Sequence, residues 1–211
     1  MKKWHDITQP LTNNMAHWPG DTPFSFSISA TKEQTGSANV GKIVTSVHMG
    51  THVDAPFHFD NNGKTIEQIP ISTYVGPALV IDVSRFSSIN STVLEEFNLG
   101  GIKRVLLRTS LPNNPSYFPK ELPYLDPEIA PYLAAKGVIL LGVDMPSVDP
   151  ITSKSLDTHH ALHHHGIHIL ENIMLDEVEP GNYELIALPL RIIGADGSPV
   201  RAILRSMEEN S

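Results

Sequence analysis

Three histidines and one aspartate that could bind a metal ion lie within eleven residues of the chain. The segment reads His48-Met49-Gly50-Thr51-His52-Val53-Asp54-Ala55-Pro56-Phe57-His58. Neutral imidazole nitrogen and carboxylate oxygen are side-chain ligands that zinc accepts, at about 2.0–2.2 Å. The chain has eleven histidines, so chance clustering is the plain alternative. Against it, Gly50 and Pro56 break the segment in the way that is typical of loops carrying functional residues. The segment therefore predicts a metal site.

A sharp bend is needed before His48 and His52 can reach one ion. Residues four apart on a straight strand are separated by about 13 Å, at about 3.3 Å per residue. A helix would bring the two rings together, but Gly50 and the β-branched Thr51 and Val53 argue against a helix. We therefore expect an extended segment that bends at Gly50.

A second histidine-rich segment, residues 156–171, ends in a carboxylate that should be buried. On a strand, Glu171 shares parity with Ile167 and Ile169 and would face the core, where an unpaired carboxylate is costly and needs a cation. A metal ion would supply that cation. His159 and His160 both lie within reach in sequence, and the pattern alone does not choose between them. Most of the neighbouring histidines are expected on a solvated helix face, and no role in the site is expected for His163, His164, His165 or His168.

Composition limits the class of protein and its partners. The 211 residues are 40% hydrophobic, without a composition shift or long linker, and predict a single domain, 1–211. A net charge of −8 without a Lys/Arg cluster argues against nucleic acid and against an anionic membrane surface. Neither a signal peptide nor a transmembrane-length segment is found, and there are no cysteines, so we expect a cytoplasmic protein. A zinc site without thiolate ligands is more typical of a catalytic than of a structural site, since structural zinc sites mostly use cysteine.

The elements that must position these residues are mostly strands. Apolar and β-branched runs predict strands at Lys42–Val47, Ala78–Val83, Arg104–Arg108, Val138–Val143, Ile167–Leu170, Glu184–Leu188 and Val200–Leu204. Helices are expected from a capping box at Thr92 to Gly100, from Asp126 as N-cap to Gly137, and over residues 156–165. Strands outnumber helices and the connections vary in length, which predicts an α/β fold with a mixed sheet and few helices.

The motif from His48 to His58 resembles the signature of the cyclase-type metal-dependent hydrolases. Residues 18–23, Trp-Pro-Gly-Asp-Thr-Pro, resemble the N-terminal motif of the bacterial kynurenine formamidase branch of that family. Residues 147–150, the segment from His159 to Glu171, and residues 188–190 also fit in order, so the resemblance covers nearly the whole chain. It implies a swivelling β/β/α fold, a homodimer and two zinc ions per chain, with manganese as the alternative metal.

The resemblance also implies a role for each residue that matches the motif. His48, His52 and Asp54 would hold the first zinc, Asp54 and Glu171 would bridge, and His159 would bind the second. His159 is preferred to His160 because the ligand histidine of the family precedes its glutamate by the interval from His159 to Glu171. His58 matches the general acid/base and Trp18 the aromatic residue that contacts substrate. Met49 departs from the small or polar residue often found at its position, which affects pocket shape.

The activity implied by this resemblance is hydrolysis of N-formyl-L-kynurenine, a small aromatic formamide, to L-kynurenine and formate in tryptophan breakdown. Two alternatives stay open. One is another amide hydrolase of the same family, such as an isatin hydrolase using manganese. The other is a non-catalytic metal carrier that binds through the triplet His163 to His165. Serine-hydrolase, thiol and nucleotide chemistries lack their motifs. Turn or capping roles are expected for Asp144, Ser147 and Asp149.

Overall fold

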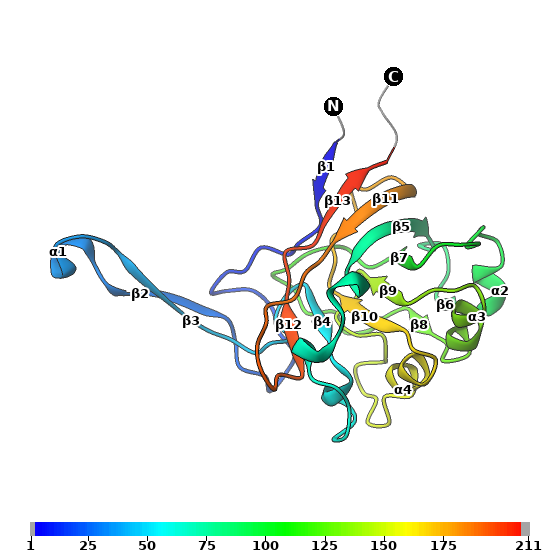
Figure 1. The fold of residues 1–211 in the computed structure, drawn as a ribbon, viewed down its shortest axis with the longest axis horizontal. Helices are drawn as coiled ribbons and strands as arrows, with labels where there is room; N and C mark the ends of the chain where they lie inside the picture. The colour runs from blue at the N-terminus through cyan, green and yellow to red at the C-terminus, as the bar shows by residue number, and fades with distance from the viewer. Residues whose placement is uncertain (1–2, 208–211) are drawn as a thin grey trace.

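The fold is built around one large mixed sheet, as a computed structural model covering residues 3–207 describes it. The spatial order of its nine strands is β1 (Trp4–Asp6), β13 (Ile203–Ser206), β11 (Gly181–Ile186), β5 (Val75–Asp82), β7 (Arg104–Arg108), β9 (Leu140–Val143), β10 (His168–Glu171), β4 (His52–Asp54) and β12 (Gly197–Pro199). The first and last strands in the chain pair with each other, so both ends lie at one edge of the sheet (Figure 1). The expected mixed α/β fold with few helices is confirmed.

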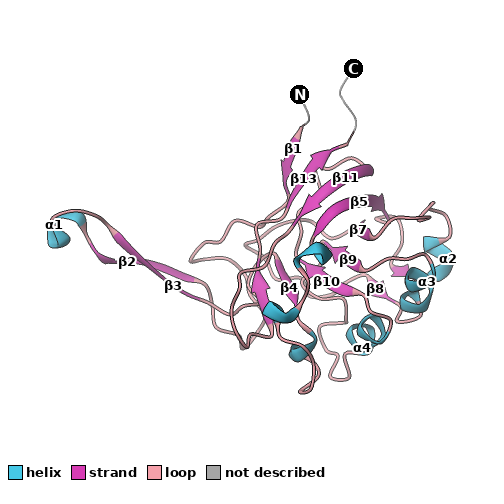
Figure 2. Cartoon of the chain, in the orientation of Figure 1, coloured by secondary structure: helices cyan, strands magenta, loops and turns pink. Residues whose placement is uncertain are grey.

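Four central strands, β5, β7, β9 and β10, run parallel, and the outer strands are antiparallel to their neighbours. Parallel neighbours need crossover connections, and these carry the helices. The helices are α2 (Ser91–Leu94), α3 (Ile129–Ala135) and α4 (Asp157–His164). They gather on one side of the sheet (Figure 2). Because β9 and β10 are parallel, their carboxyl ends meet at the same edge, where ligand sites of such sheets form.

Both faces of the central strands are buried, and alternate side chains belong to separate cores. Along β7, Val105 and Leu107 pack in the cluster that includes the helices, whereas Leu106 packs in the cluster on the opposite face. This burial explains why these strands are continuous apolar runs in the sequence. A tight contact occurs at Gly142, where an added Cβ would lie 2.4 Å from Leu106 Cδ2.

A two-stranded hairpin projects away from the body of the molecule (Figure 1). It consists of β2 (Ser25–Ala30) and β3 (Val40–Val44), joined through the short helix α1 (Lys32–Thr35). Nearly all of its residues are exposed. The run Lys42–Val47 is therefore only partly a strand and lies outside the main sheet.

The remaining expectations are met with shifted boundaries. Strand β7 is as predicted, and α4 matches the expected helix to within one residue at each end. Helix α2 is shorter than expected and its N-cap is Asn90, not Thr92; α3 follows Glu128 instead of Asp126. Several elements were not predicted: the strands β1, β2 and β12 and the helix α1, the short strands β6 (Ser88–Ile89) and β8 (Tyr124–Leu125), and the 3-10 turns η1 (Pro56–His58), η2 (Ile66–Gln68) and η3 (Ile71–Thr73). Within the described range, no helix is long and apolar enough to cross a membrane.

Candidate metal centre

The two segments that sequence analysis singled out lie on neighbouring strands. Strand β4 is antiparallel to β10, and His52 pairs in register with Glu171. Val53 and Leu170 pack into the core on the face opposite the helices. Strand alternation therefore turns His52, Asp54 and Glu171 toward the helix side, where α4 lies. All three are buried.

The expected bend at Gly50 is confirmed and brings His48 back to the same site. Gly50 has φ +61°, in the left-handed region that glycine adopts without steric cost. As a result, His48 Nδ1 lies 3.0 Å from Asp54 Oδ1. The ring fits beside Gly197 of β12, where an added Cβ would lie 2.8 Å from His48 Cε1. A larger residue at position 197 would displace the imidazole.

His52 is oriented by the backbone of the same segment. Its Nδ1 donates to the Gly50 carbonyl at 2.8 Å, so in the neutral ring the unprotonated nitrogen is Nε2, which is directed at the carboxylates. That Nε2 lies 3.4 Å from Asp54 Oδ1 and 3.3 Å from Glu171 Oε2. The tautomer and the direction of the ring both suit a metal ligand.

His159 is oriented by a carboxylate behind it. Its Nδ1 lies 2.6 Å from Asp149 Oδ2, and the same carboxylate accepts the backbone N–H groups of Thr158 and His159 at the start of α4, each at 3.0 Å. The other nitrogen, Nε2, lies 3.4 Å from Asp54 Oδ2 and 3.7 Å from Glu171 Oε1. A carboxylate behind a histidine is the usual support of a metal-binding imidazole.

The structure separates His159 from the neighbouring histidines. His159 is buried, whereas His160 is exposed on the same helix. His164 and His165 are exposed as well, and His163 is half-buried outside the carboxylate cluster. His159 and not His160 therefore lies in the carboxylate cluster, and the triplet from His163 to His165 lies apart from it.

The clustered donors fit a pair of divalent ions. Three sets of ligand atoms each lie within 4.8 Å of one another: His48, His52 and Asp54; Asp54, His159 and Glu171; and, at the more exposed side, His48, His58 and Asp196. Asp54 belongs to the first two. Its Oδ2 is buried and accepts no hydrogen bond from residues 3–207, which is costly for a carboxylate oxygen without a cation. Nitrogen and oxygen donors without sulfur suit zinc or manganese.

Carboxylates control the charge of the cluster. Burial alone would lower the pKa values of its histidines, but hydrogen bonds to carboxylates raise the pKa of His48 to about 9 and those of His52 and His159 to about 10. Desolvation would raise the pKa of Asp54, but the imidazoles of His159, His48 and His52 beside it hold that pKa well below its ordinary value. The buried carboxylates thus favour positive charge at every position around them.

His58 lies beside the cluster and is more exposed than the histidines in it. Its ring centroid is 3.9 Å from that of His48, and its Nδ1 is 3.4 Å from Asp196 Oδ2. Desolvation lowers the pKa of His58, so the ring is neutral near pH 7 and can accept a proton. Asp196 also lies 2.9 Å from His48 Nε2 and connects the two rings.

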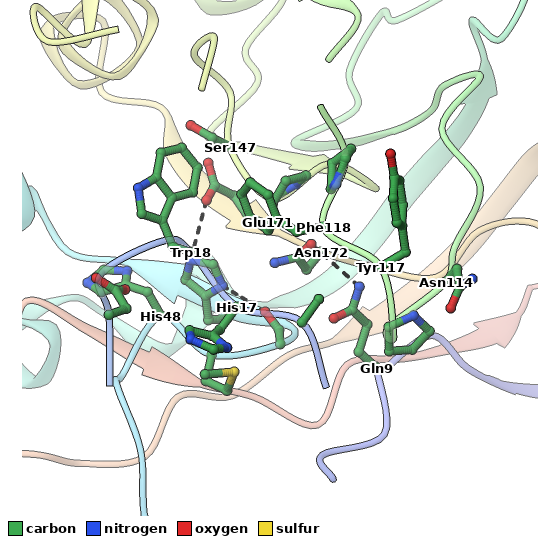
Figure 3. Close-up of a pocket in the computed structure, with 18 of the residues that line it drawn as sticks. Gln9, His17, Trp18, His48, Asn114, Tyr117, Phe118, Ser147, Glu171 and Asn172 are labelled. Atoms are coloured by element: carbon green, nitrogen blue, oxygen red, sulfur yellow. Dashed lines mark hydrogen bonds and ion pairs between the residues drawn. The ribbon is translucent and has the colours of Figure 1, made fainter. Parts of the chain in front are cut away.

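An aromatic pocket opens above the cluster (Figure 3). Trp18 and Phe118 meet edge to face, with centroids 5.5 Å apart at 86°. His48, His58, His159 and Glu171 line the same cavity, which has a volume of about 190 Å³. Trp18 is therefore close enough to the candidate centre for one small aromatic molecule to touch both.

Two supporting carboxylates were not predicted as site residues. Asp149 was expected to act in a turn or cap; it does cap α4, and it also holds His159. Asp196 lies in a turn, 148 positions from His48 in the chain, and only the pairing of β12 with β4 brings it to the site. No local sequence signal marks Asp196 as a partner of His48.

Comparison with known proteins gives consistent results. Residues 5–150 match the family described as putative cyclase. The chain is 59% identical over 205 residues to a kynurenine formamidase of Bacillus cytotoxicus, covering 97% of this chain and 98% of that protein. A solved structure described as a potential metal-dependent hydrolase with cyclase activity matches with a TM-score of 0.84 and 27% identity, covering 99% of this chain and all of that one. Isatin hydrolase A from Labrenzia aggregata shares the fold, with a TM-score of 0.83, 23% identity, and coverage of 98% and 94%.

Proposed function

The chain belongs to the bacterial kynurenine formamidases of the cyclase family of metal-dependent hydrolases, and from this premise we propose that it hydrolyses N-formyl-L-kynurenine to L-kynurenine and formate. It is a hydrolase of linear amides. The observation that carries the proposal is Asp54, whose buried oxygen has no hydrogen-bond donor among the described residues and lies between two histidine-bearing ligand sets. These sets lie at one end of an aromatic pocket.

The donors around Asp54 would hold two zinc ions per chain. His48, His52 and Asp54 would bind the first, His159 the second, and Asp54 and Glu171 would bridge them. When bound, such a pair of ions lowers the pKa of a shared water and polarises a carbonyl oxygen. The buried carboxylates would hold the ions close together.

His58 would move the proton that hydrolysis requires. It would accept a proton from the attacking water and return it to the anilino nitrogen as the bond from that nitrogen to the formyl carbon breaks. Water thus supplies the hydroxyl group of formate and the hydrogen of the released amine. Asp196, 3.4 Å from His58 Nδ1, would orient the ring.

Trp18 would place the substrate's aromatic ring. Its edge-to-face contact with Phe118 fixes the plane of the indole at the pocket wall. An aryl ring stacked on such a plane buries apolar area with little loss of side-chain freedom. The formamide nitrogen would then face His58.

A substrate panel tests the proposal. Zinc-loaded protein is expected to hydrolyse N-formyl-L-kynurenine with a kcat/KM of about 10⁴ M⁻¹s⁻¹ or higher, and well above isatin or simple esters. Asp54→Asn, purified in parallel, controls for contaminating activity and should be inactive. A preference for isatin would instead support an isatin hydrolase, and no turnover with zinc or manganese would support a metal carrier.

Metal content is a separate test of the same centre. Elemental analysis of tag-free protein should give about two divalent ions per chain. Glu171→Ala should reduce both occupancy and activity, because Glu171 reaches toward His52 and His159 alike. Intact occupancy and activity in this variant would contradict the arrangement.

We also propose a homodimer, supported by the exposed hairpin. Phe26, Ile28, Ile43 and Val44 on β2 and β3 are each 46–60% exposed, although an isolated two-stranded hairpin is barely stable in water. A second copy covering these side chains would explain both features. Ile43→Asp should shift sedimentation equilibrium toward the monomer, while Ile71→Asp, at an exposed position outside the hairpin, serves as control. A monomeric wild type would refute the dimer.

A cytoplasmic location is also proposed, since a chain without cysteine suits a reducing compartment.

A further inference from the structure

Two amide side chains face each other in the pocket next to the metal centre. Gln9, which follows the N-terminal strand, donates from Nε2 to Asn172 Oδ1 at 3.4 Å. Asn172 comes directly after the candidate ligand Glu171, and both amides line the same cavity as Trp18 (Figure 3). At 3.4 Å the bond is long for N–H···O, so a ligand can compete for these groups.

A buried hydroxyl fixes the backbones that carry the two amides. Thr51 Oγ1 accepts the Gln9 backbone N–H at 2.8 Å and donates to the Asn172 carbonyl at 2.6 Å. Thr51 is buried and lies next to His52 in the candidate ligand segment. The Asn172 backbone N–H donates to the Met145 carbonyl at 2.9 Å. Both amides are therefore attached to the framework of the metal centre.

Asn172 adopts an uncommon backbone conformation. Its φ is +56°, and the other non-glycine residue with positive φ in the range 3–207, Leu156, also lines this pocket. Such conformations cluster at binding and active sites. Asparagine tolerates the left-handed region better than most residues. With its backbone groups bonded elsewhere, the side-chain Nδ2 of Asn172 has no protein partner among the described residues.

The chemistry of the pair fits a zwitterion. Each primary amide offers two N–H donors and a carbonyl acceptor, so a pair can donate to a carboxylate and accept from an ammonium group. Among the described residues that line the pocket there is no lysine or arginine, and Asn114 adds a third amide. Asp21 also lines the pocket, so the cavity favours a ligand end that carries an ammonium group beside its carboxylate over a simple anion.

We propose that Gln9 and Asn172 form the subsite that binds the α-ammonium and α-carboxylate groups of N-formyl-L-kynurenine, which rests on the proposed function. The ring would lie against Trp18 and the formamide at the metal centre. The amino-acid end would reach the amide pair on the other side of Glu171. Selectivity for an amino-acid substrate over a simple aryl formamide would come from these two side chains.

The test compares two substrates that differ only at this end. N-formyl-L-kynurenine carries the amino-acid group, and 2-formamidoacetophenone has the same formamide and aryl ketone without it. Asn172→Gly removes the amide but keeps access to positive φ, and Gln9→Ala keeps the backbone N–H bonded to Thr51. Asn62→Gly, in an exposed turn, is the matched control.

Each subsite variant should lose about 10–100-fold in kcat/KM on N-formyl-L-kynurenine, mainly through KM, as expected for lost hydrogen bonds to charged groups. On 2-formamidoacetophenone the change should stay within about twofold, since the reacting atoms are untouched. Equal losses on both substrates would assign the pair a structural role and overturn the inference. No loss on either would overturn it as well.

Binding of L-kynurenine, measured by titration calorimetry, separates this inference from the proposed activity. Both subsite variants should weaken binding about tenfold or more, while Asn62→Gly should not. If the wild type binds L-kynurenine through the amide pair but does not hydrolyse its formamide, the proposed function fails and the subsite stands. If the variants bind L-kynurenine as the wild type does, the subsite is refuted even when turnover is observed.

Discussion

Replacement of Asp149 by asparagine tests whether the candidate centre depends on the carboxylate behind His159. Asp149 is buried, and its Oδ2 lies 2.6 Å from His159 Nδ1 and 3.0 Å from the His159 backbone N–H. Its Oδ1 accepts the Thr158 N–H at 3.0 Å. Asparagine can keep one oxygen for Thr158, but its amino group would then face two N–H donors of His159. The substitution is nearly isosteric and changes mainly the support of one imidazole.

The size of the effect follows from these contacts. Carboxylates that orient a metal-binding histidine typically contribute 10–100-fold to metal affinity, or about 1.4–2.7 kcal/mol. The loss of one acceptor at the start of α4 adds roughly 1–2 kcal/mol of lost stability. The hydrogen bond to Asp149 also raises the pKa of His159, so the variant ring is a weaker base. We expect the second ion to be bound about 10–100-fold more weakly and the first to be little affected.

Competition with a chromogenic chelator measures both affinities on metal-stripped, tag-free protein. Thr158→Val is the matched control, because it removes the hydroxyl bond to the Leu125 carbonyl but leaves the Thr158 N–H and His159 bonded to Asp149. It should lower the unfolding free energy without changing metal affinity. If Asp149→Asn binds both ions as tightly as the wild type, His159 is not held for a metal in the way we infer.

Three further outcomes are expected. His58→Ala should keep most of its metal while kcat falls about a hundredfold or more. His52→Ala should lose both activity and metal. Equal metal loss in the two variants would make His58 a ligand. Trp18→Ala should raise KM for N-formyl-L-kynurenine more than it lowers kcat, and an unchanged KM would exclude stacking. Burial lowers the pKa of His168 from 6.5 to about 4, so protonation favours the unfolded state. Stability should therefore fall as the pH drops below about 6.5, by about 1–2 kcal/mol from this residue near pH 5. The free energy of unfolding in urea should depend less on pH in His168→Gln than in the exposed-site control His160→Gln. An identical pH dependence of the two variants would refute this prediction.

The central strands could be predicted because they are buried on both faces. Their continuous apolar runs, such as Arg104–Arg108, leave little ambiguity about type. Short strands such as β4 and β12 could not be predicted, because each has three residues, too few to show a periodic pattern. They form because they pair with neighbouring strands. The run Lys42–Val47 is a strand only in its first part, within β3, and nothing local in its β-branched residues shows that this strand lies in an exposed hairpin.

Part of the candidate site could likewise be predicted from the sequence, and part could not. The spacing within residues 48–58 indicated a bend at Gly50, and the parity of Glu171 indicated a buried carboxylate; the fold has both features. The choice of His159 over His160 needs the direction in which each leaves α4, which the sequence pattern did not settle. Asp196 and Gln9 were missed because each reaches the pocket through contacts between distant parts of the chain: Asp196 through the pairing of β12 with β4, and Gln9 through the bridge between Thr8 and Ile173.

Each of the three candidate imidazole ligands is oriented by hydrogen-bond partners within the fold. His52 is held by the Gly50 carbonyl, His159 by Asp149, and His48 by Asp196 and Asp54. All of these partners are protein groups, so the fold itself orients the imidazoles. The same carboxylates raise the pKa values of the three histidines, so the site attracts protons and metal ions alike. Metal ions must displace those protons, which links metal binding to proton release.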